Sequence, residues 1–251
     1  MLTSRKTANE AENDWISISD LMSALMIIFL FIAVSYMHNV KTEKDQVQTE
    51  KDRIQANQRR IRRIAVAYRE LQVNLYDELY KEFKDDLPKW KATIEKKTLS
   101  VRFEEPEVLF ATGSAEISDR FQEILGDFFP RYIRIISSEK YRKSIEEIRI
   151  EGHTSSEWNG NVSEEDAYFN NMSLSQDRTR SALRFCLDLI KNLSKREWAR
   201  KFITANGLSS SHPILTSERI ENKEKSRRVE FRTRTKAEEK VVQIIEEMEE
   251  I

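Results

Sequence analysis

The chain has 251 residues, and its 42 Lys and Arg residues nearly balance its 43 Asp and Glu residues, giving a formal net charge of −1 at pH 7. This balance excludes a bulk attraction to polyanions, so no direct binding to nucleic acid is expected. With 34% charged residues but only 5 Gly and 4 Pro, the composition favours long solvated helices and one modest folded domain.

The first predicted element is an apolar helix over residues 15–37, a run that contains no Lys, Arg or Glu and a single Asp, Asp20. As a helix this run would span about 34 Å, against about 30 Å for the hydrocarbon layer of a bilayer. The alternative is a cleavable signal peptide, but the run exceeds the roughly 7 to 15 apolar residues of such peptides. No small-residue cleavage motif follows Tyr36 either. We therefore expect a retained transmembrane helix, preceded by a short segment over residues 1–14.

Asp20 is the candidate functional residue of this helix, because it lies about 7 to 8 Å inside the bilayer end marked by Trp15. An ionisable group in a membrane span costs about 2.5 to 3.5 kcal/mol at the centre and usually marks an ion pathway. Apolar surroundings favour the protonated form of a carboxyl group, so Asp20 is suited to carry protons, with Ser23 as a hydrogen-bonding neighbour on the same face. The alternative is a carboxylate that reaches the interface or pairs with a basic residue of a partner helix.

One helix cannot enclose a proton path, so further helices must come from a second copy of this chain, from a different subunit, or from both. The segment "DWISISDLMSALMIIFLFIAV" resembles the transmembrane signature of MotB-type stator subunits. It is more similar to the version in the ZorB family, the B subunits of Zorya anti-phage defence systems. The resemblance implies that Asp20 carries the proton that drives a ring of MotA-like or ZorA-like subunits around a dimer of this chain. Flagellar stator subunits have Tyr-Ala before the aspartate, whereas Ile18 and Ser19 stand here, which counts against that alternative.

A polar segment over residues 38–97 follows and is predicted to be a helical stalk, reaching roughly 70 Å if helical until Pro88. Apolar residues recur in it every seven positions, at Val40, Val47, Ile54, Ile61, Tyr68 and Leu75. Polar residues such as Glu43 and Glu50 occupy the second position of the seam. The pattern leaves open a weak coiled coil and a single exposed helix.

Residues 98–235 are predicted to form one folded domain, because short extended patterns alternate there with helical ones. Extended patterns occupy residues 99–103, 107–113, 145–154, 202–208 and 227–233, and helical patterns occupy residues 118–138 and 173–193. This order predicts an α+β fold, a mixed sheet with helices on one face. The acidic residues 236–251 are predicted to form a closing C-terminal helix.

Four pieces of this domain resemble motifs of the OmpA-like peptidoglycan-binding family, namely "FATGSAEI", "EGHTS", "NMSLSQDRT" and "KSRRVEF". They occur in the family's order, which is more specific than any single piece. The resemblance implies an OmpA-like domain that binds the peptide stem of peptidoglycan at its diaminopimelate. The binding positions that it implies are Thr154, Ser155, Asn171, Leu174 and Arg178.

The chemistry of these residue types suits such a ligand, because a guanidinium group such as that of Arg178 forms paired hydrogen bonds to a carboxylate. One departure concerns Ser155, which stands where the family has an Asp that would meet the ammonium group of the ligand. Glu157 is a candidate substitute, in a loop that also carries Trp158.

Two neighbouring motifs receive structural interpretations. His153 has no nucleophile or acid at a recognisable spacing, so we expect a buried turn histidine that hydrogen-bonds to backbone. Arg227 and Arg228 are expected to be sheet residues, one of them facing inward or paired and the other solvated.

Orientation follows from the wall-binding domain rather than from charge. Basic residues are more numerous after the membrane helix than before it, which mildly favours a cytoplasmic C-terminal side, but long domains cross membranes largely regardless of charge. Since peptidoglycan lies outside the inner membrane, the resemblance implies a cytoplasmic N-terminus and a periplasmic domain. The expected function is a wall-anchored B subunit of a proton-driven motor in anti-phage defence. The alternatives are a flagellar stator subunit and a purely structural wall tether. No nucleotide-binding loop, metal-ligand spacing or nucleophile triad is found, so no enzyme, cofactor or metal is expected.

Overall fold

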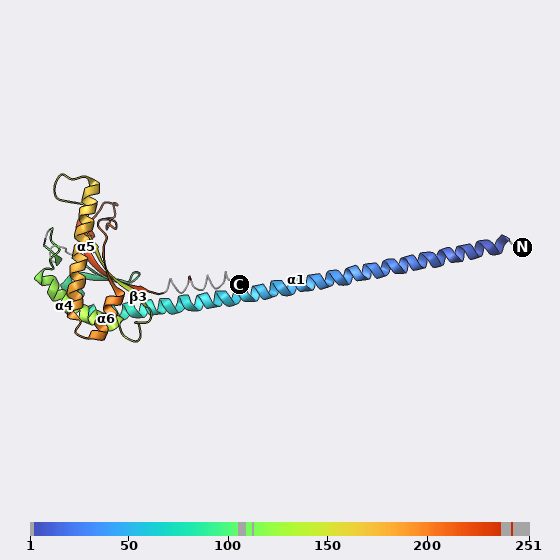
Figure 1. Ribbon diagram of the computed structural model, residues 1–251, viewed down its shortest axis with the longest axis horizontal. Coiled ribbons are helices and arrows are strands. Elements are labelled where there is room, and N and C mark those ends of the chain that lie inside the picture. Colours follow the sequence, from blue (N-terminus) through green and yellow to red (C-terminus); the bar gives the residue numbers. More distant parts are fainter. Residues whose placement is uncertain (1–2, 105–108, 112, 237–241, 243–251) are drawn as a thin grey trace. The chain divides into compact units, whose positions relative to one another are not determined.

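The computed structural model describes the backbone of residues 3–104, 109–111, 113–236 and 242, and within these ranges the side chains of residue 15 and of residues from 18 onward. The chain divides into two compact units, Met1–Arg62 and Arg63–Ile251. Helix α1 (Thr3–Phe83) makes up the described part of the first unit, and its last turns belong to the second unit (Figure 1). The helix predicted over residues 236–251 falls on residues 237–241 and 243–251, which lie outside the described residues.

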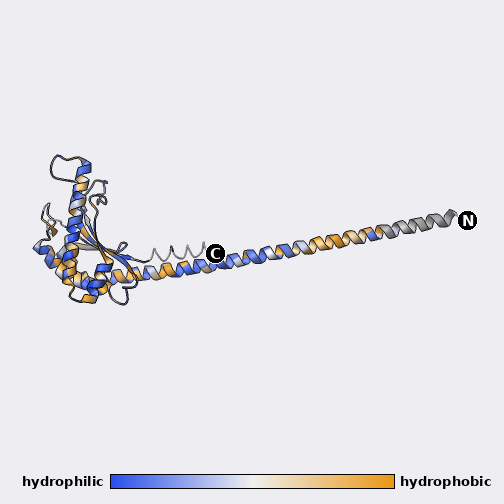
Figure 2. Ribbon diagram, viewed as in Figure 1, coloured by the Kyte–Doolittle hydropathy of each residue, from blue (hydrophilic) through white to orange (hydrophobic). Residues whose placement is uncertain are grey.

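The apolar run over residues 15–37 is helical throughout and forms part of α1, as the sequence predicts. The described side chains of this run, those of residues 15 and 18–37, are exposed in the single chain, with 47% of Leu25 and 74% of Phe31 accessible. Within the part of the chain that the structure describes, α1 is the one helix long and apolar enough to cross a membrane, with a mean hydropathy of 2.3 in its apolar window. Figure 2 shows this apolar band, followed along the chain by mostly hydrophilic turns.

The region expected to be a stalk, residues 38–97, departs from the prediction at its C-terminal end. Helix α1 ends at Phe83, the short helix α2 (Leu87–Trp90) follows, and strand β1 (Ala92–Glu95) begins six residues before residue 98. The last turns of α1 place Leu75, Leu79 and Phe83 in the hydrophobic core, each with 0% exposure. Apolar residues four apart share one face of a helix, so this stripe docks on the domain and the compact unit begins at Arg63.

The second unit is built on a five-stranded sheet in the order β1-β2-β5-β3-β4. The remaining strands are β2 (Ser100–Phe103), β3 (Ile145–His153), β4 (Ile203–Gly207) and β5 (Arg228–Thr235). Strands β3 and β4 are parallel, whereas the other neighbouring pairs are antiparallel. The sheet is therefore mixed, as predicted, and a parallel pair needs a crossover connection, which α5 (Glu164–Leu189) and α6 (Leu193–Phe202) supply.

The two faces of the sheet differ in chemistry because side chains alternate along a strand. Ile150 lies opposite Phe231 and Gly152 lies opposite Val229, so these residues share one apolar face. Helix α4 (Asp119–Ile136) packs there, with the Phe128 ring 5.2 Å from that of Phe231. Helix α5 packs on the same face, since a β-carbon at Gly152 would stand 2.7 Å from the Thr179 Cγ2 atom. The helices thus cover one face, as expected, and charged residues populate the other.

Two predicted elements have different bounds in the structure. Helix α5 begins at Glu164 rather than near residue 173, because Ser163 caps its first turn by accepting a hydrogen bond from the Asp166 backbone nitrogen at 3.1 Å. The extended piece predicted over residues 107–113 leads into a turn at Gly113, across which Phe110 pairs with Ile117 in an isolated bridge. Gly113 has a φ of 70°, a conformation that glycine adopts without strain. Residues 107, 108 and 112 of this piece lie outside the described residues.

Candidate functional site

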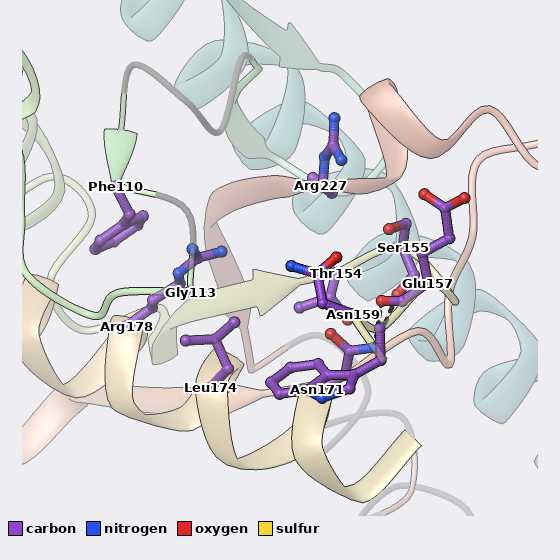
Figure 3. A pocket seen from close by; sticks show the side chains of 11 residues that line it. Phe110, Gly113, Thr154, Ser155, Glu157, Asn159, Asn171, Leu174, Arg178 and Arg227 are labelled. Atoms are coloured by element: carbon purple, nitrogen blue, oxygen red, sulfur yellow. Dashed lines mark hydrogen bonds between the residues drawn. The ribbon is translucent and has the colours of Figure 1, made fainter. Parts of the chain in front are cut away.

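A cavity of about 250 Å³ opens beside the C-terminal end of β3 and the first half of α5 (Figure 3). The five positions that the OmpA-like motifs imply all line it: Thr154, Ser155, Asn171, Leu174 and Arg178. The other lining residues are Phe110, Gly113, Glu157, Trp158, Asn159 and Arg227. The structure therefore brings together side chains that come from four separated stretches of the sequence.

The strand ends position the first wall of the cavity. Strand β3 ends at His153, and Thr154 follows with its backbone nitrogen donating to the Ser209 carbonyl at 2.9 Å. The Leu208 nitrogen donates to the Gly152 carbonyl at 2.9 Å, which extends the parallel pairing of β3 and β4 by one bond. Thr154 and Ser155 are only 4% and 3% exposed, so this turn is fixed by buried backbone bonds.

Asn171 holds the neighbouring loop from its place on α5. Its Nδ2 atom donates to the Ser155 carbonyl at 3.2 Å and to the Glu157 carbonyl at 3.1 Å. The residue is 3% exposed. Both amide hydrogens are used on the backbone of the loop, so Asn171 shapes the cavity by positioning the turn.

Arg178 links α5 to the turn that carries Phe110. Its Nε atom donates to the Ser114 carbonyl at 2.8 Å, and its Nη2 atom donates to the Ala111 carbonyl at 3.3 Å. The guanidinium also lies 5.0 Å from the centre of the Phe110 ring. Burial and the charge of Arg227 lower the pKa of Arg178 to about 10, so the group stays positively charged at neutral pH.

Arg227 is a lining residue that the sequence assigned to the sheet. Strand β5 begins one residue later, at Arg228, which is buried and donates to Glu230 at 2.6 Å. The Nε atom of Arg227 is buried without a hydrogen-bond partner among the described residues. A signal existed in the sequence, since Arg227 has the same parity as Val229 and Phe231 and so belongs to the face that the helices cover.

Glu157, the acidic residue among the described cavity lining, already forms an ion pair. Glu157, which the sequence suggested as a substitute for the missing Asp at Ser155, pairs with Lys223 through its Oε1 atom. The hydrogen bond from Lys223 lowers the pKa of Glu157. Trp158, from the same loop, lines the cavity and adds an aromatic surface to it.

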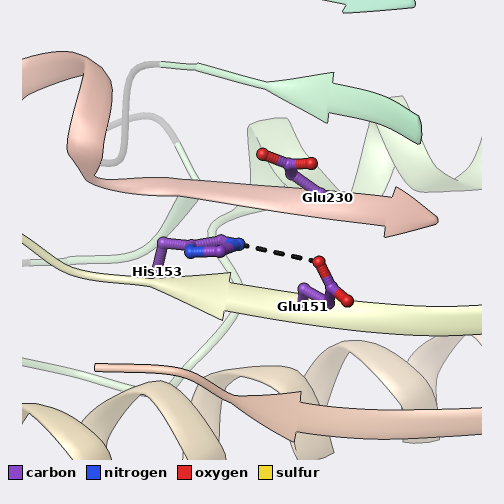
Figure 4. A group of neighbouring side chains, drawn as sticks. All are labelled: Glu151, His153 and Glu230. Atoms are coloured by element: carbon purple, nitrogen blue, oxygen red, sulfur yellow. Dashed lines mark ion pairs between the residues drawn. The ribbon is translucent and has the colours of Figure 1, made fainter. Parts of the chain in front are cut away.

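A second group of polar residues lies on the charged face of the sheet, where Glu151, His153 and Glu230 gather with ligand atoms within 4.8 Å of one another (Figure 4). The Glu230 Oε1 atom accepts from the Nε atoms of Arg228 at 2.6 Å and of Arg102 at 3.0 Å. These arginines neutralise the carboxylate and repel a further cation, so the group is an ion-pair network.

His153 differs from the prediction that its ring bonds to backbone. Neither ring nitrogen has a hydrogen-bond partner among the described residues, and the side chain is 3% exposed. Its ring packs against that of His212 at 6.2 Å, and its Nε2 atom lies 3.9 Å from the nearer Glu151 oxygen. Burial first and the charge of Arg228 second lower the pKa of His153 to about 3, so the ring is neutral at physiological pH.

The two positions predicted to serve proton transfer lie in the first unit, on α1. Ser23 donates from its hydroxyl to the Ser19 carbonyl at 2.8 Å, a bond within its own helix. Asp20, three residues before Ser23, is exposed in the single chain. In the single chain the Ser23 hydroxyl therefore donates its hydrogen bond to the helix backbone and not to the Asp20 carboxyl group.

The comparisons with known proteins are of three kinds. No protein-family model matches the chain. A solved MotB-like protein from Desulfovibrio vulgaris is similar with 23% identity and a TM-score of 0.47, covering 69% of this chain and 94% of that one. The cell wall anchor of the type VI secretion system from Pseudomonas aeruginosa is similar with 22% identity and a TM-score of 0.43, covering 62% and 96%. The periplasmic domain of Helicobacter pylori MotB is similar with 18% identity and a TM-score of 0.39, covering 59% and 85%.

A curated relative gives a stronger match. The Zorya protein ZorB of Escherichia coli strain Crooks is 43% identical over 233 residues, which cover 93% of this chain and 92% of the relative. The alignment therefore includes nearly the whole of both chains, the apolar helix as well as the sheet domain. By this identity and coverage the chain belongs to the ZorB family.

Proposed function

We propose that this chain is the peptidoglycan-anchored B subunit of a proton-driven membrane motor in anti-phage defence. In this proposal α1 crosses the inner membrane once, with residues 1–14 in the cytoplasm and the sheet domain in the periplasm. The domain binds the cell wall, and Asp20 carries the protons. Membership of the ZorB family supports the defence role, because the family belongs to Zorya systems.

The observation that carries the wall-binding part is the convergence of five motif residues on one cavity. Thr154 and Ser155 follow β3, whereas Asn171, Leu174 and Arg178 lie on α5. The cavity offers a cationic guanidinium, a buried hydroxyl and aromatic surface. Such a set suits a carboxylate-bearing peptide, which is the chemistry of a peptidoglycan stem.

The motor part rests on the single acid of the apolar run. A lone helix cannot surround a proton path, so Asp20 requires neighbouring helices, and we assign these to a second copy of this chain and to a ring of ZorA-like subunits. The exposed apolar side chains of α1, such as Leu25 and Phe31, suit burial against lipid and such helices.

Retention on purified cell-wall sacculi tests the anchoring role directly. Full-length chain in detergent should sediment with sacculi, and Arg178→Ala should reduce that retention severalfold. Arg180→Ala is the matched control, because Arg180 lies on the same helix but has a 75% exposed side chain. Equal retention of Arg178→Ala and the unmodified chain would remove Arg178 from the binding site, and absence of retention for the unmodified chain would refute wall binding.

Proton flux tests the motor role. Vesicles that contain the chain and its ZorA-like partner should conduct protons, and Asp20→Asn should abolish the conductance, because an amide cannot exchange a proton at that position. Unchanged flux in Asp20→Asn would leave a structural wall tether as the function. Serine at position 23 offers a second variant, Ser23→Ala, which should reduce the flux without abolishing it.

A further inference from the structure

We infer that the outer edge of β4 is a pairing site for the same edge of a second copy of this chain, and that the side chain of Gln176 keeps this edge closed. The edge takes no part in the proposed wall binding or proton transfer, so its test is independent of the proposed function. The inference gives Gln176 the role of a strap across an edge strand.

Strand β4 is one of the two outermost strands of the sheet, with β3 as its neighbour. The Leu208 nitrogen donates to the Gly152 carbonyl of β3. Since alternate residues of a strand direct their backbone groups to the same side, Asn206 also faces β3, whereas Ala205 and Gly207 face outward. An outer edge with unpaired backbone groups is a template for the strand of another chain.

The sequence of β4 offers no protection of its own. The strand reads Ile-Thr-Ala-Asn-Gly over Ile203–Gly207, without a charged residue or a proline, which are common protecting residues of edge strands. The opposite outer strand β1 is different, because it is shorter, ends in Glu95 and is followed by Lys96 and Lys97. Protection of β4 must therefore come from outside the strand.

Gln176 supplies this protection from its exposed position on α5. Its Nε2 atom donates to the Ala205 carbonyl at 3.2 Å, and its Oε1 atom accepts from the Gly207 nitrogen at 2.8 Å. The side-chain amide thus occupies one outward acceptor and one outward donor, two of the bonds that an added strand would make. The Ile203 nitrogen donates to the Ala199 carbonyl of α6, so this donor of the strand is also taken.

The partner that fits this edge is the same strand of a second copy. Two β4 strands related by a twofold axis run antiparallel, so the outward donors and acceptors of one strand meet those of the other. Ala205 and Gly207 carry small side chains, which leave room for a second strand beside them. In the proposed motor two copies share one complex, which raises the local concentration of this edge. The strap then keeps the two β4 edges apart.

Self-association of the full-length chain in detergent tests the inference. Gln176→Ala removes the amide and so opens the edge. As the concentration is raised about a hundredfold, the weight-average protein mass of this variant, measured by sedimentation, should rise toward about twice that of the unmodified chain. The unmodified chain should keep its mass over the same range.

Amide hydrogen exchange at Gly207 gives a second readout. In dilute Gln176→Ala this amide should exchange about tenfold faster than in the unmodified chain, because its acceptor is gone. Pairing of two edges should slow the exchange again at high concentration. A folding defect would instead speed the exchange at every concentration.

Two control variants separate an open edge from the loss of a hydrogen bond. Gln176→Glu keeps an acceptor for Gly207, loses the donor to Ala205 and places a negative charge on the edge, so it should keep the mass of the unmodified chain. Gln122→Ala removes a comparable bond at the start of α4, from the Gln122 Nε2 atom to the Ile117 carbonyl at 3.1 Å, and should not associate.

Each outcome decides the inference. Mass and exchange that both depend on concentration in Gln176→Ala, but not in the two controls, would support it. An unchanged mass of folded Gln176→Ala over the whole range would overturn the pairing site. Equal association of Gln176→Glu, or association of Gln122→Ala, would assign the contact to another surface or to unfolded chain and would overturn it too. Retention on sacculi and proton flux are measured separately, so failure here leaves the proposed function standing.

Discussion

Gly207 on β4 lies so close to Gln176 on α5 that a β-carbon at position 207 would stand 2.3 Å from the Gln176 backbone nitrogen. Side-chain bonds reinforce this approach, because the Gly207 nitrogen donates to the Gln176 Oε1 atom at 2.8 Å and Gln176 Nε2 donates to the Ala205 carbonyl at 3.2 Å. Strand β4 thus fixes the distance between the sheet and α5, the helix that carries Asn171 and Arg178. The shape of the cavity depends on a glycine outside it.

Gly207→Ala should lower the free energy of unfolding by about 2 to 3 kcal/mol, because backbone atoms of α5 would have to move away from the sheet. Gly126→Ala is the control, since Gly126 lies in α4 with open space around its Cα atom. That substitution should raise the free energy of unfolding by about 0.5 to 1 kcal/mol through helix propensity. Denaturant titration followed by tryptophan fluorescence measures both. Equal stability of Gly207→Ala and the unmodified chain would contradict the close approach.

Arg131 should be the strongest polar attachment of the last turns of α1 to α4. Its guanidinium donates to Glu82 at 2.8 Å and to Asp86 at 2.9 Å, and it lies 4.9 Å from the centre of the Phe83 ring. Arg131→Met should lower the free energy of unfolding by about 1 to 3 kcal/mol, since Glu82 and Asp86 lose their most buried cationic partner and are left with the exposed Arg134 and Lys89.

The control for this prediction uses the same acceptor. Arg134 bonds to the same Glu82 oxygen at 2.7 Å, but its side chain is 61% exposed. Arg134→Gln should therefore change the free energy of unfolding by less than about 1 kcal/mol. A larger loss for Arg134→Gln than for Arg131→Met would show that burial of the guanidinium does not decide the strength of the attachment.

Acidification should destabilise the domain through His153. Burial and Arg228 lower its pKa to about 3, so between the ordinary value of 6.5 and 3 the unfolded chain binds a proton that the folded chain does not. The contribution of His153 to the free energy of unfolding is therefore fully present above pH 6.5. As the pH is lowered from 6.5 to 4.5, this contribution decreases by up to about 2 to 3 kcal/mol. Burial raises the pKa of Glu151, which acts in the opposite direction in the same range and reduces the net change.

His153→Gln isolates this effect. Without the histidine most of the loss on acidification between pH 6.5 and 4.5 should disappear, because the raised pKa of Glu151 acts in the opposite direction in this range. Glu230 contributes little between pH 6.5 and 4.5. Burial, which would raise its pKa, is outweighed by the hydrogen bond from Arg228, and the pKa falls to about 2, so the stability that Glu230 contributes is lost mainly below pH 4.5. Unfolding titrations at three pH values measure the slope. An unchanged slope in the variant would assign the pH response to other groups.

Asn171→Ala should weaken the cavity without removing a charge. The Ser155 and Glu157 carbonyls would lose their donor, and we expect about 1 to 2 kcal/mol less free energy of unfolding together with reduced retention on sacculi. Ser173→Ala, at an exposed position of the same helix, should change neither quantity. Full retention by Asn171→Ala would mean that the loop keeps its position without the amide.

The parts of the fold that the sequence predicts well are those where the hydrophobic pattern decides. Ile148 and Ile150 alternate with charged residues as β3 requires, and Val229 and Phe231 do the same in β5. The resemblance to OmpA-like motifs also located five lining residues of the cavity. Local pattern and motif order were enough in these cases because each residue acts through its own strand or helix.

The remaining features depend on tertiary contacts. The first nine residues of α5 lack an apolar stripe, and their helix follows from the Ser163 cap and three acids in the first turn. The ring nitrogens of His153 lack hydrogen-bond partners among the described residues. This depends on packing by residues such as His212, which lies far along the chain. Arg227 and Arg228 were both expected to be sheet residues. Strand β5 begins at Arg228, so Arg228 pairs with Glu230 in the sheet, whereas Arg227 precedes the strand and lines the cavity.

Strand β5 comes last in chain order among the described strands but lies in the middle of the sheet, since it is hydrogen-bonded to β2 on one side and to β3 on the other. A ribosome that has made the chain as far as residue 227 has therefore produced two separate half-sheets, β1-β2 and β3-β4, with nothing to join them. The sheet can close only after β5 has been synthesised. Premature termination before β5 should accordingly yield a chain with an apolar helix but no folded domain, rather than a shortened domain that still works.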